Sequence, residues 1–390
     1  MTHRPVVVHV TTTDMSLDWL LGPQLQAFAD AGYRVIGMSA PGPHVDHLRE
    51  QGVEHVALSG FTRSRRALDD VRAFWQLVAA LRRVRPDIVH THNPKPGVLG
   101  RIAGRLCRVP LVVNTQHGLY AQPTDRRRRR WPVYAAERIA AAFSHVELVQ
   151  SPEDVDTLIH RLHVPVGKVV WLGNGIDLDR FSPATIPPAE RAALRHEWQA
   201  TDDDLVVGVV GRLVTEKGIA EICAAAARLT HHRPRLRMVV IGPADDDKED
   251  AVADDLVEAA GRDGVVFTGR RDDMPRCYAA MDLFVTASWR EGFPRAAMEA
   301  AAMGLPIVAT DVRGNRQVVD DGVTGVLVPV RDPDALAAAI VSLADRPDTR
   351  RSMSAAAVAL AAREFGQQRV IDRTLDTYRR LNDARGVPSS

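Results

Sequence analysis

The sequence predicts two doubly wound α/β domains, each a parallel sheet with helices on both faces. At 390 residues, the chain exceeds the size at which one hydrophobic core usually stops growing. Short β-branched runs alternate with longer segments rich in alanine, leucine and arginine, which is typical of parallel strands covered by helices. The alternation stops at a proline-rich stretch near the middle of the chain and then begins again, which indicates a second domain.

Four runs in the first half and five in the second are predicted to be strands. Those in the first half are VVVHV from Val6, RVIGMS from Arg34, DIVHTH from Asp87 and LVVNTQ from Leu111. Those in the second half are LVVGVVGRL from Leu205, RMVVIGP from Arg237, GVVFTG from Gly264, LFVTAS from Leu283 and PIVATD from Pro306.

Prolines at 183, 187 and 188 disfavour a continuous helix or a central strand, so we predict a linker near Leu178 to Ala200. The predicted domains are residues 1–180 and 181–365. Residues 366–390 are expected to form a C-terminal helix that packs back toward the first domain.

Composition excludes several classes of protein. Lysine plus arginine (50) almost balances aspartate plus glutamate (49), so no overall charge favours nucleic acid. The three cysteines show no metal-ligand spacing and suit a reducing compartment. Because no apolar stretch reaches the roughly 18 residues of a membrane span, we predict a cytoplasmic protein that does not cross the bilayer.

Two segments that follow predicted strands could bind a ligand, because open α/β sheets bind ligands beyond the carboxyl ends of their strands. GRLVTEKG, residues 211–218, places Arg212 and Lys217 where they could meet phosphate oxygens. The segment lacks the P-loop pattern, and taken alone it could equally be a solvated turn.

The segment SWREGFPRAAMEAAAMGLPIVATD, residues 288–311, is mostly small and apolar, yet it carries Glu291 and Glu299. Buried carboxylates need partners, and Pro294 suits the first turn of a helix whose N–H groups could bind an anion. With a diphosphate bound at that helix, Glu299 could bind the hydroxyls of a ribose and Glu291 those of a hexose. The alternative is two glutamates on a solvated helix face.

In order and spacing, GRLVTEKG, NGID and the segment from Phe267 to Pro329 resemble the retaining glycosyltransferases of family 4. The resemblance covers essentially the whole second domain. It implies the GT-B fold, in which two Rossmann-like domains face each other across a cleft, and a nucleotide diphosphate sugar, of the UDP type, as donor. The donor-binding residues it implies are Gly22, Asn174, Arg212, Lys217, Arg270, Arg271, Glu291, Gly292, Phe293, Pro294 and Glu299, with Asp177 also lining the cleft.

The first domain resembles the branch of this family that builds capsular polysaccharides and lipid-linked oligosaccharides. HVTTTDMSLDWLLGPQLQAFADAGYRV, PKPGVLGRIAGRL and TQHGLY carry the similarity. Many relatives have paired glycines in the first loop, whereas this chain has only Gly22 before Pro23. His117 matches the histidine that contacts the reacting sugar, although a histidine beside a glycine can also simply end a strand. His92 and Lys95 are candidate acceptor contacts.

The resemblance implies transfer of a hexose or N-acetylhexosamine to a glycan hydroxyl with retention, the departing phosphate taking the acceptor proton. His117, Glu291, Arg212 and Lys217 would be the catalytic residues. No cofactor or metal is expected, because cationic side chains and a helix N-terminus supply the positive field. The acidic runs at 202–204 and 245–250 are expected to be solvated.

Three alternatives remain open at this stage. A nucleotide-sugar 2-epimerase would share the fold and the donor pocket, and a transferase could use a soluble small-molecule acceptor. A nicotinamide dehydrogenase is disfavoured, because no GxGxxG follows the first strand.

The segment TDRRRRRWPVYAAERIAAAFSH, residues 124–145, places five arginines, Arg126 to Arg130, before Trp131 and a mainly apolar stretch. Such a cluster suits an anionic membrane surface. We therefore predict peripheral attachment to the inner face of the cell membrane, near a polyprenyl-diphosphate-linked acceptor. The alternative is a solvated loop followed by a helix packed on its own domain.

Overall fold

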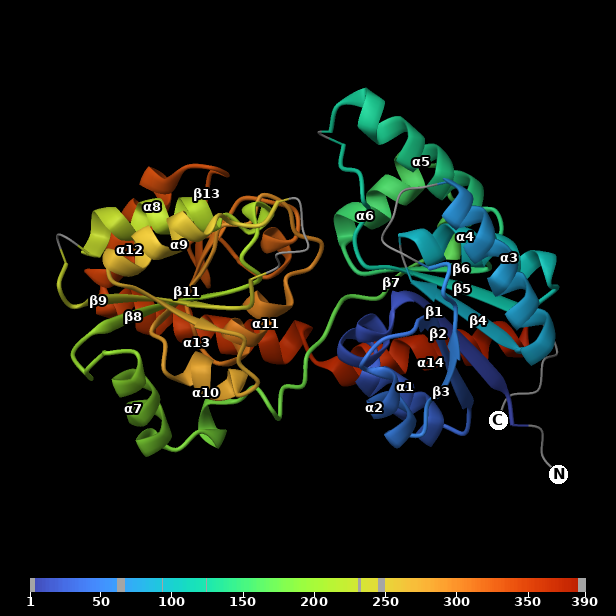
Figure 1. Ribbon diagram of the computed structural model, residues 1–390, viewed down its shortest axis with the longest axis horizontal. Coiled ribbons are helices and arrows are strands. Elements are labelled where there is room, and N and C mark those ends of the chain that lie inside the picture. Colours follow the sequence, from blue (N-terminus) through green and yellow to red (C-terminus); the bar gives the residue numbers. More distant parts are fainter. Residues whose placement is uncertain are drawn as a thin grey trace. The chain divides into compact units, whose positions relative to one another are not determined.

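In the computed structural model the chain forms two compact units, and the structure describes residues 4–61, 67–92, 94–123, 125–230, 233–244 and 250–384. Unit 1 contains the chain up to Gly173 and again from Arg369, and unit 2 runs from Asn174 to Gln368 (Figure 1). The segment by which the chain enters unit 2 is hydrogen-bonded to the segment by which it leaves. Ile176 N–H donates to Phe365 over 2.8 Å, and its carbonyl accepts from Gln367 over 2.9 Å.

Unit 1 is built on a seven-stranded sheet in which every pair of neighbours is parallel. The order is β3 (Glu54–Ala57), β2 (Arg34–Ala40), β1 (Val6–Thr13), β4 (Ile88–His92), β5 (Leu111–Gln116), β6 (Val146–Val149) and β7 (Val169–Trp171). The order reverses between β1 and β4, which is where sheets of this kind bind ligands.

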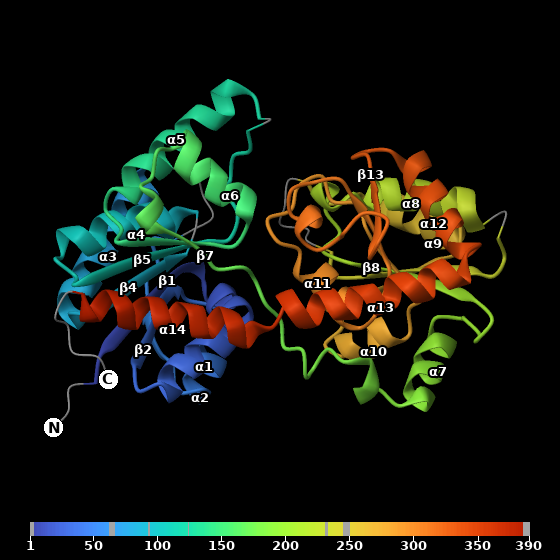
Figure 2. The same cartoon turned by 180° about the vertical axis from the view of Figure 1, so that it is seen from behind.

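Helices cover both faces of this sheet (Figures 1 and 2). One face packs against α1 (Gly22–Asp30), α2 (Val45–Glu50) and α14 (Gln367–Asp383). The other packs against α3 (Ala67–Val84) and α4 (Lys95–Leu106). Further along the chain, α5 (Arg127–Ala141) contacts α4, and α6 (Pro152–Asp156) follows β6.

Unit 2 repeats the design with a six-stranded parallel sheet. The order is β10 (Val265–Gly269), β9 (Leu236–Ile241), β8 (Leu205–Val210), β11 (Leu283–Thr286), β12 (Ile307–Thr310) and β13 (Gly325–Val328). One core holds α7 (Pro188–Glu197), α10 (Met274–Ala279), α11 (Arg295–Ala302) and most of α13 (Pro347–Glu364). The opposite core holds α8 (Ile219–Thr230), α9 (Asp254–Arg262) and α12 (Pro333–Ala344).

Two expectations about the chain between the sheets need correction. Residues 178–200 are not a linker, because they belong to unit 2, where Leu194 and Trp198 are each 1% exposed in its core. Pro188 begins α7 instead of preventing a helix, since a helix does not need the first N–H that proline lacks. The units change at 173/174 and 368/369, whereas the prediction placed the changes at 180/181 and 365/366.

Among the described residues, no helix combines the length and the apolar character needed to cross a membrane.

Candidate functional site

In unit 2, a salt bridge joins the loops after β8 and β11, the two strands that flank the reversal of strand order. Lys217 ends the short helix after β8, and its Nζ lies 2.5 Å from Oε1 of Glu291, in the loop after β11. Ser288 Oγ donates to the same oxygen over 2.8 Å. Because Lys217 is 29% exposed and Glu291 13% exposed, the pair remains within reach of a ligand.

Glycines allow these loops to approach each other closely. Gly218 has φ +70°, and a Cβ there would lie 2.1 Å from the carbonyl oxygen of Ala287. A Cβ on Gly314, in the loop after β12, would lie 2.6 Å from Cβ of Glu291. Any side chain at either position would therefore displace the loop that carries Glu291.

Trp289 adds contacts between the loop after β11 and the segment after β8. Its backbone N–H donates to the carbonyl of Glu216 over 2.9 Å, and its indole N–H donates to Glu221 over 2.8 Å. The guanidinium of Arg331 lies 3.8 Å from the centre of the indole ring. The position of Glu291 is therefore held by contacts on several sides before any ligand binds.

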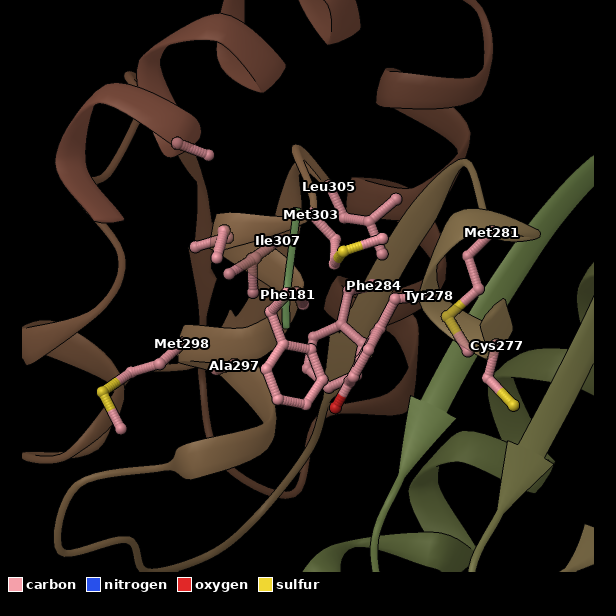
Figure 3. Packing of buried hydrophobic residues seen from close by; sticks show 14 of the residues in the cluster. Phe181, Cys277, Tyr278, Met281, Phe284, Ala297, Met298, Met303, Leu305 and Ile307 are labelled. Atoms are coloured by element: carbon pink, nitrogen blue, oxygen red, sulfur yellow. The ribbon is translucent and has the colours of Figure 1, made fainter. Parts of the chain in front are cut away.

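Glu299 has a buried partner that sequence reasoning missed. Tyr278, on α10, donates its hydroxyl to Oε2 of Glu299 over 2.9 Å, and its ring packs beside Phe181 and Phe284 (Figure 3). Arg295 Nε lies 3.4 Å from the other carboxylate oxygen. Burial raises the pKa of Glu299, while Arg295 and Tyr278 oppose that rise. Glu299 is thus a constrained carboxylate in the second turn of α11.

The helix start near Glu299 is one residue later than expected. Pro294 is the residue before α11, which begins at Arg295, and no side chain caps its first turn. Phe293 packs edge-to-face on Phe365 with ring centres 6.2 Å apart, and Gly292 lies between Phe293 and Glu291. The loop from Glu291 to Pro294 therefore leads directly into the uncapped helix start.

The side chains of Arg270 and Arg271 are held by acids. Arg270 lies 3.1 Å from Asp272, and Arg271 lies 2.8 Å from Asp273 and 2.5 Å from Glu197. Hydrogen bonds to Asp273 and Glu197 raise the pKa of Arg271. Any role of this loop in binding the donor would therefore fall to its backbone.

The remaining predicted donor residues lie at separate places. Arg212 is half-buried directly after β8, next to Gly211. Asn174 begins unit 2, and its side-chain oxygen accepts a hydrogen bond from Gly175 N–H over 2.9 Å. Gly22 belongs to unit 1, where it is buried as the first residue of α1. A Cβ there would meet only Gln51, at 3.9 Å, so packing within the protein does not require glycine.

In unit 1, His117 lies just beyond β5 at the carboxyl edge of the sheet. Its Nε2 is 2.9 Å from Nδ1 of His92, and a hydrogen bond to the Gln150 side chain also involves the ring. Burial lowers the pKa of His117 to about 4, against the opposing effect of Gln150. The ring is therefore neutral at physiological pH.

The environment of His92 and Lys95 differs from that expected of acceptor contacts. His92 is 2% exposed, and both of its ring nitrogens face other histidines. Alternation along β4 turns its side chain into the unit, so it lies behind His117. The ammonium group of Lys95, at the start of α4, lies 2.6 Å from Asp70 of α3. An acceptor anion would have to compete with that carboxylate.

A polar cluster that sequence reasoning missed lies beyond β1 and β2. Both carboxylate oxygens of Asp18 are 2.8 Å from ring nitrogens, one of His44 and one of His47. Trp19, 46% exposed, meets the His44 ring edge-on with centres 4.9 Å apart. Asp18 and Trp19 lie in a short helical segment after β1, whereas His44 and His47 lie at the start of α2 after β2. No spacing in the sequence indicates that they meet.

Three buried histidines place ring nitrogens within 4.8 Å of one another: His9, His90 and His92. They are poorly arranged to bind a metal. The rings of His90 and His92 stack with centres 4.5 Å apart and planes 25° apart, and those of His9 and His92 stack at 5.4 Å and 18°. Because the lone pairs of imidazole lie in the ring plane, nearly parallel stacked rings do not direct them at one ion.

The first acidic run, residues 202–204, lies before β8, at the opposite end of that strand from Arg212 and Lys217. Asp204 accepts hydrogen bonds from the backbone and hydroxyl of Thr201, which closes the turn before β8. Asp202 and Asp203 are exposed. Of the second run, residues 245–249 lie outside the described residues.

Known proteins resemble this chain over most of its length. The family model Glycosyltransferase Family 4 matches residues 24–180, and the model Glycosyl transferases group 1 matches residues 204–346. D-inositol 3-phosphate glycosyltransferase of Kribbella flavida is 32% identical over 316 residues, which are 75% of this chain and 71% of that protein. The chain belongs to glycosyltransferase family 4. It is therefore a glycosyltransferase, as its motifs indicate.

Other relatives of this glycosyltransferase agree. UDP-Gal:alpha-D-GlcNAc-diphosphoundecaprenol alpha-1,3-galactosyltransferase of Escherichia coli is 29% identical over 312 residues, 78% of each chain. A glycosyltransferase from Rickettsia africae superposes with a TM-score of 0.81 at 17% identity, covering 97% of this chain and 99% of that one. HepE of Anabaena, solved with UDP, superposes with a TM-score of 0.80 at 20% identity, covering 96% of this chain and 99% of that one. The predicted fold class, GT-B with two Rossmann-like domains, is confirmed.

Proposed function

We propose that this glycosyltransferase moves a hexose or N-acetylhexosamine from a UDP-sugar to a hydroxyl of a polyprenyl-diphosphate-linked glycan, with retention at the anomeric carbon. The observation that carries the proposal is the Lys217–Glu291 pair, held at 2.5 Å where the strand order of unit 2 reverses. The Escherichia coli relative, by its name, uses UDP-galactose and a diphosphoundecaprenol-linked acceptor, and HepE was solved with UDP.

The charges around the pair suit a sugar diphosphate. Lys217, Arg212 and the uncapped N-terminus of α11 supply positive charge for the phosphates. Glu299, constrained by Tyr278, is suited to accept hydrogen bonds from the two ribose hydroxyls. Glu291 would hold a hydroxyl of the transferred sugar. Positive charge fixed at the phosphates stabilises the departing diphosphate more strongly as the glycosidic bond breaks.

The surroundings of Glu291 support retention without an enzyme nucleophile. Its Oε1 accepts hydrogen bonds from both Lys217 and Ser288, which makes that oxygen a weaker nucleophile and fixes its direction. In the proposed reaction the acceptor oxygen bonds to the anomeric carbon on the face that the diphosphate leaves. The departing phosphate oxygen takes the acceptor proton, so neither a metal nor a cofactor is required.

The exposed face of α5 supports an acceptor carried on a membrane. Arg126 precedes the helix and Arg127 to Arg130 occupy its first turn, where the helix dipole disfavours cations by about 0.3–1 kcal/mol each. No hydrogen bond or ion pair joins the side chains of Arg126, Arg127 and Arg128 to a described residue. Trp131 is 74% exposed. Anionic lipid would stabilise this arrangement of cations around an exposed tryptophan.

Internal contacts fix which side of α5 faces outward. Glu137, on a different face of the helix from Trp131, lies 2.5 Å from Arg101 of α4, and both are buried. Arg101 also lies 2.8 Å from Glu147 of β6. Ile139, two turns after Trp131, is 58% exposed. The helix is therefore anchored on one side, with two large apolar side chains on the other.

The release of nucleoside diphosphate tests the proposal. A panel of UDP-, GDP- and ADP-sugars is incubated with the protein, with or without a polyprenyl-diphosphate N-acetylglucosamine acceptor. We expect UDP release from one UDP-sugar only when the acceptor is present, and its loss in Lys217→Met. Glu216→Gln changes an exposed neighbour on the same loop and serves as the control. Conversion of the UDP-sugar into an isomer without acceptor would instead show an epimerase.

A further inference from the structure

The outer face of α3 carries a row of exposed, mainly apolar side chains, here called the α3 stripe. Leu68 is 84% exposed, and Val71 and Trp75 are each 56% exposed. Ala79 and Arg82 continue the row and are also exposed. Because successive helix residues are rotated by about 100°, these five side chains lie within an arc of about 80°. A contiguous exposed row of this kind is a candidate interaction surface.

Contacts on the inner side of α3 fix which residues face outward. Leu77 is fully buried in the core between α3 and the sheet. The carboxylate of Asp70 lies 2.6 Å from the ammonium group of Lys95 on α4. The side-chain oxygen of Gln76 accepts a hydrogen bond from Gly60 N–H over 2.8 Å. The helix therefore cannot rotate to bury the α3 stripe without losing these contacts.

The α3 stripe is symmetric about Trp75. Val71 and Ala79 lie four residues before and after it, and Leu68 and Arg82 lie seven residues before and after it. A second α3 helix that runs antiparallel, related by a two-fold axis at Trp75, therefore places Val71 opposite Ala79. It also places Leu68 opposite the aliphatic stem of Arg82. Each larger side chain then faces a smaller or more flexible one, so the stripe is complementary to itself, as a two-fold interface requires.

Charges beside the α3 stripe favour the same arrangement. Asp69 lies in the first turn of α3 and Arg83 in the last, and neither side chain has a hydrogen bond or ion pair with a described residue. Both lie on the same flank of the stripe, at about 100° and 60° from Leu68. In an antiparallel pair equal flanks meet, and Asp69 of one copy lies within about 3 Å, along the helix axis, of Arg83 of the other. The pairing therefore allows two ion pairs between the copies.

The pattern suits a protein helix better than a lipid surface. Each helical turn contributes about one side chain to the α3 stripe, as in the seam between two packed helices, whereas helices that lie on a membrane present a broader apolar face. The carboxylate of Asp69 would be repelled by anionic lipid. Against a second copy, the same carboxylate gains a cation.

We propose that the α3 stripe is the contact surface of a symmetric dimer, in which the α3 helices of two copies pack antiparallel about Trp75. The proposal is independent of the reaction that the protein catalyses. Because α3 has 18 residues, it is about 27 Å long, and two such helices bury less area than a standard protein interface. The dimer should therefore form at micromolar concentrations and dissociate on dilution.

Sedimentation equilibrium, over protein concentrations from micromolar to several hundred micromolar, tests the proposal without any substrate. We expect a monomer–dimer equilibrium for the wild type. Trp75→Glu should raise the dissociation constant roughly thirtyfold or more, because it removes the central tryptophan and places two carboxylates at the axis. Trp131→Glu, at the exposed tryptophan of α5, is the control and should dimerise as the wild type does. Circular dichroism checks that both variants remain folded.

Two results of this experiment would overturn the proposal. One is a wild type that stays monomeric throughout, and the other is a Trp75→Glu variant that dimerises as strongly as the wild type. If the monomeric wild type bound anionic vesicles and Trp75→Glu did not, the α3 stripe would contact lipid instead.

Charge reversal tests the antiparallel arrangement separately. Asp69→Arg and Arg83→Asp should each weaken the dimer about fivefold, which is the effect expected of exposed ion pairs. The double variant restores both ion pairs with exchanged signs, so it should dimerise as the wild type does. A double variant no stronger than the single variants would show that Asp69 and Arg83 do not meet, and would contradict the antiparallel pairing.

Discussion

Acidification should destabilise unit 1 strongly because four neutral histidines are buried together. Burial lowers the pKa values of His9, His90, His92 and His117 far below the usual 6.5. Below pH 6.5 the unfolded chain binds protons that the folded chain cannot accept, so stability is complete above that pH and is lost as the pH falls. The loss continues until the folded-state pKa values are reached, near 3 for His9 and 4 for His117.

The size of the effect follows from the distance between pH and pKa. At pH 5, which lies 1.5 units below 6.5, each histidine that stays neutral in the folded state costs about 2 kcal/mol. Four such histidines would cost roughly 8 kcal/mol, which is comparable to the whole stability of an ordinary domain. Carboxylates with lowered pKa values, such as Glu54 and Asp273, lose their contributions at lower pH. The change in stability between pH 7 and pH 5 therefore reports the protonation of the histidines.

Hydrogen exchange of the slowest amides in β1, β4 and β5 measures this stability, after correction for intrinsic exchange at each pH. We expect the opening free energy to be nearly constant from pH 8 to 7 and then to fall steeply toward pH 5. The fall should be smaller by about 2 kcal/mol in His9→Asn, which removes one titrating group. A fall of equal size in that variant, or constant stability between pH 7 and 5, would refute this reasoning.

Four further predictions concern the proposed site and the arginines. Glu299→Ala should mainly raise the donor KM, whereas Glu291→Ala should mainly lower kcat, and equal losses of donor binding in both would contradict these roles. Lys217→Ala leaves Glu291 without its cation and should lower kcat by roughly a hundredfold or more, as measured by UDP release. Activity should survive EDTA, and loss that magnesium or manganese restores would show a metal requirement. The wild type should float with anionic liposomes at low salt. Replacing Arg126 to Arg130 by glutamine should abolish flotation, whereas the control Trp75→Ala, at another exposed tryptophan, should not.

Much of the fold was predictable because its buried parallel strands are continuous apolar runs. All nine predicted strands exist, with shifts of a few residues at their ends. The strands that were missed are β3, β6, β7 and β13. They are only three or four residues long, and β3, β7 and β13 lie at sheet edges, where side chains stay partly exposed and the apolar pattern weakens.

The candidate site was predictable in its residue types but less so in its contacts. Lys217 and Glu291 were both identified, yet their salt bridge depends on two loops meeting across neighbouring strands, which local sequence does not encode. Tyr278 was missed as the partner of Glu299 because it is 21 residues away and reads as an ordinary core aromatic. His92 was expected to contact the acceptor, although the alternation along β4 turns its ring inward.

The stereochemistry of the product tests the central claim most directly. The protein is given an α-linked UDP-sugar and a polyprenyl-diphosphate-linked glycan, and proton NMR of the released oligosaccharide reports the configuration of the new linkage. The account predicts one added sugar in α linkage, formed with one equivalent of UDP. A β linkage, or consumption of the UDP-sugar without an elongated glycan, would contradict it.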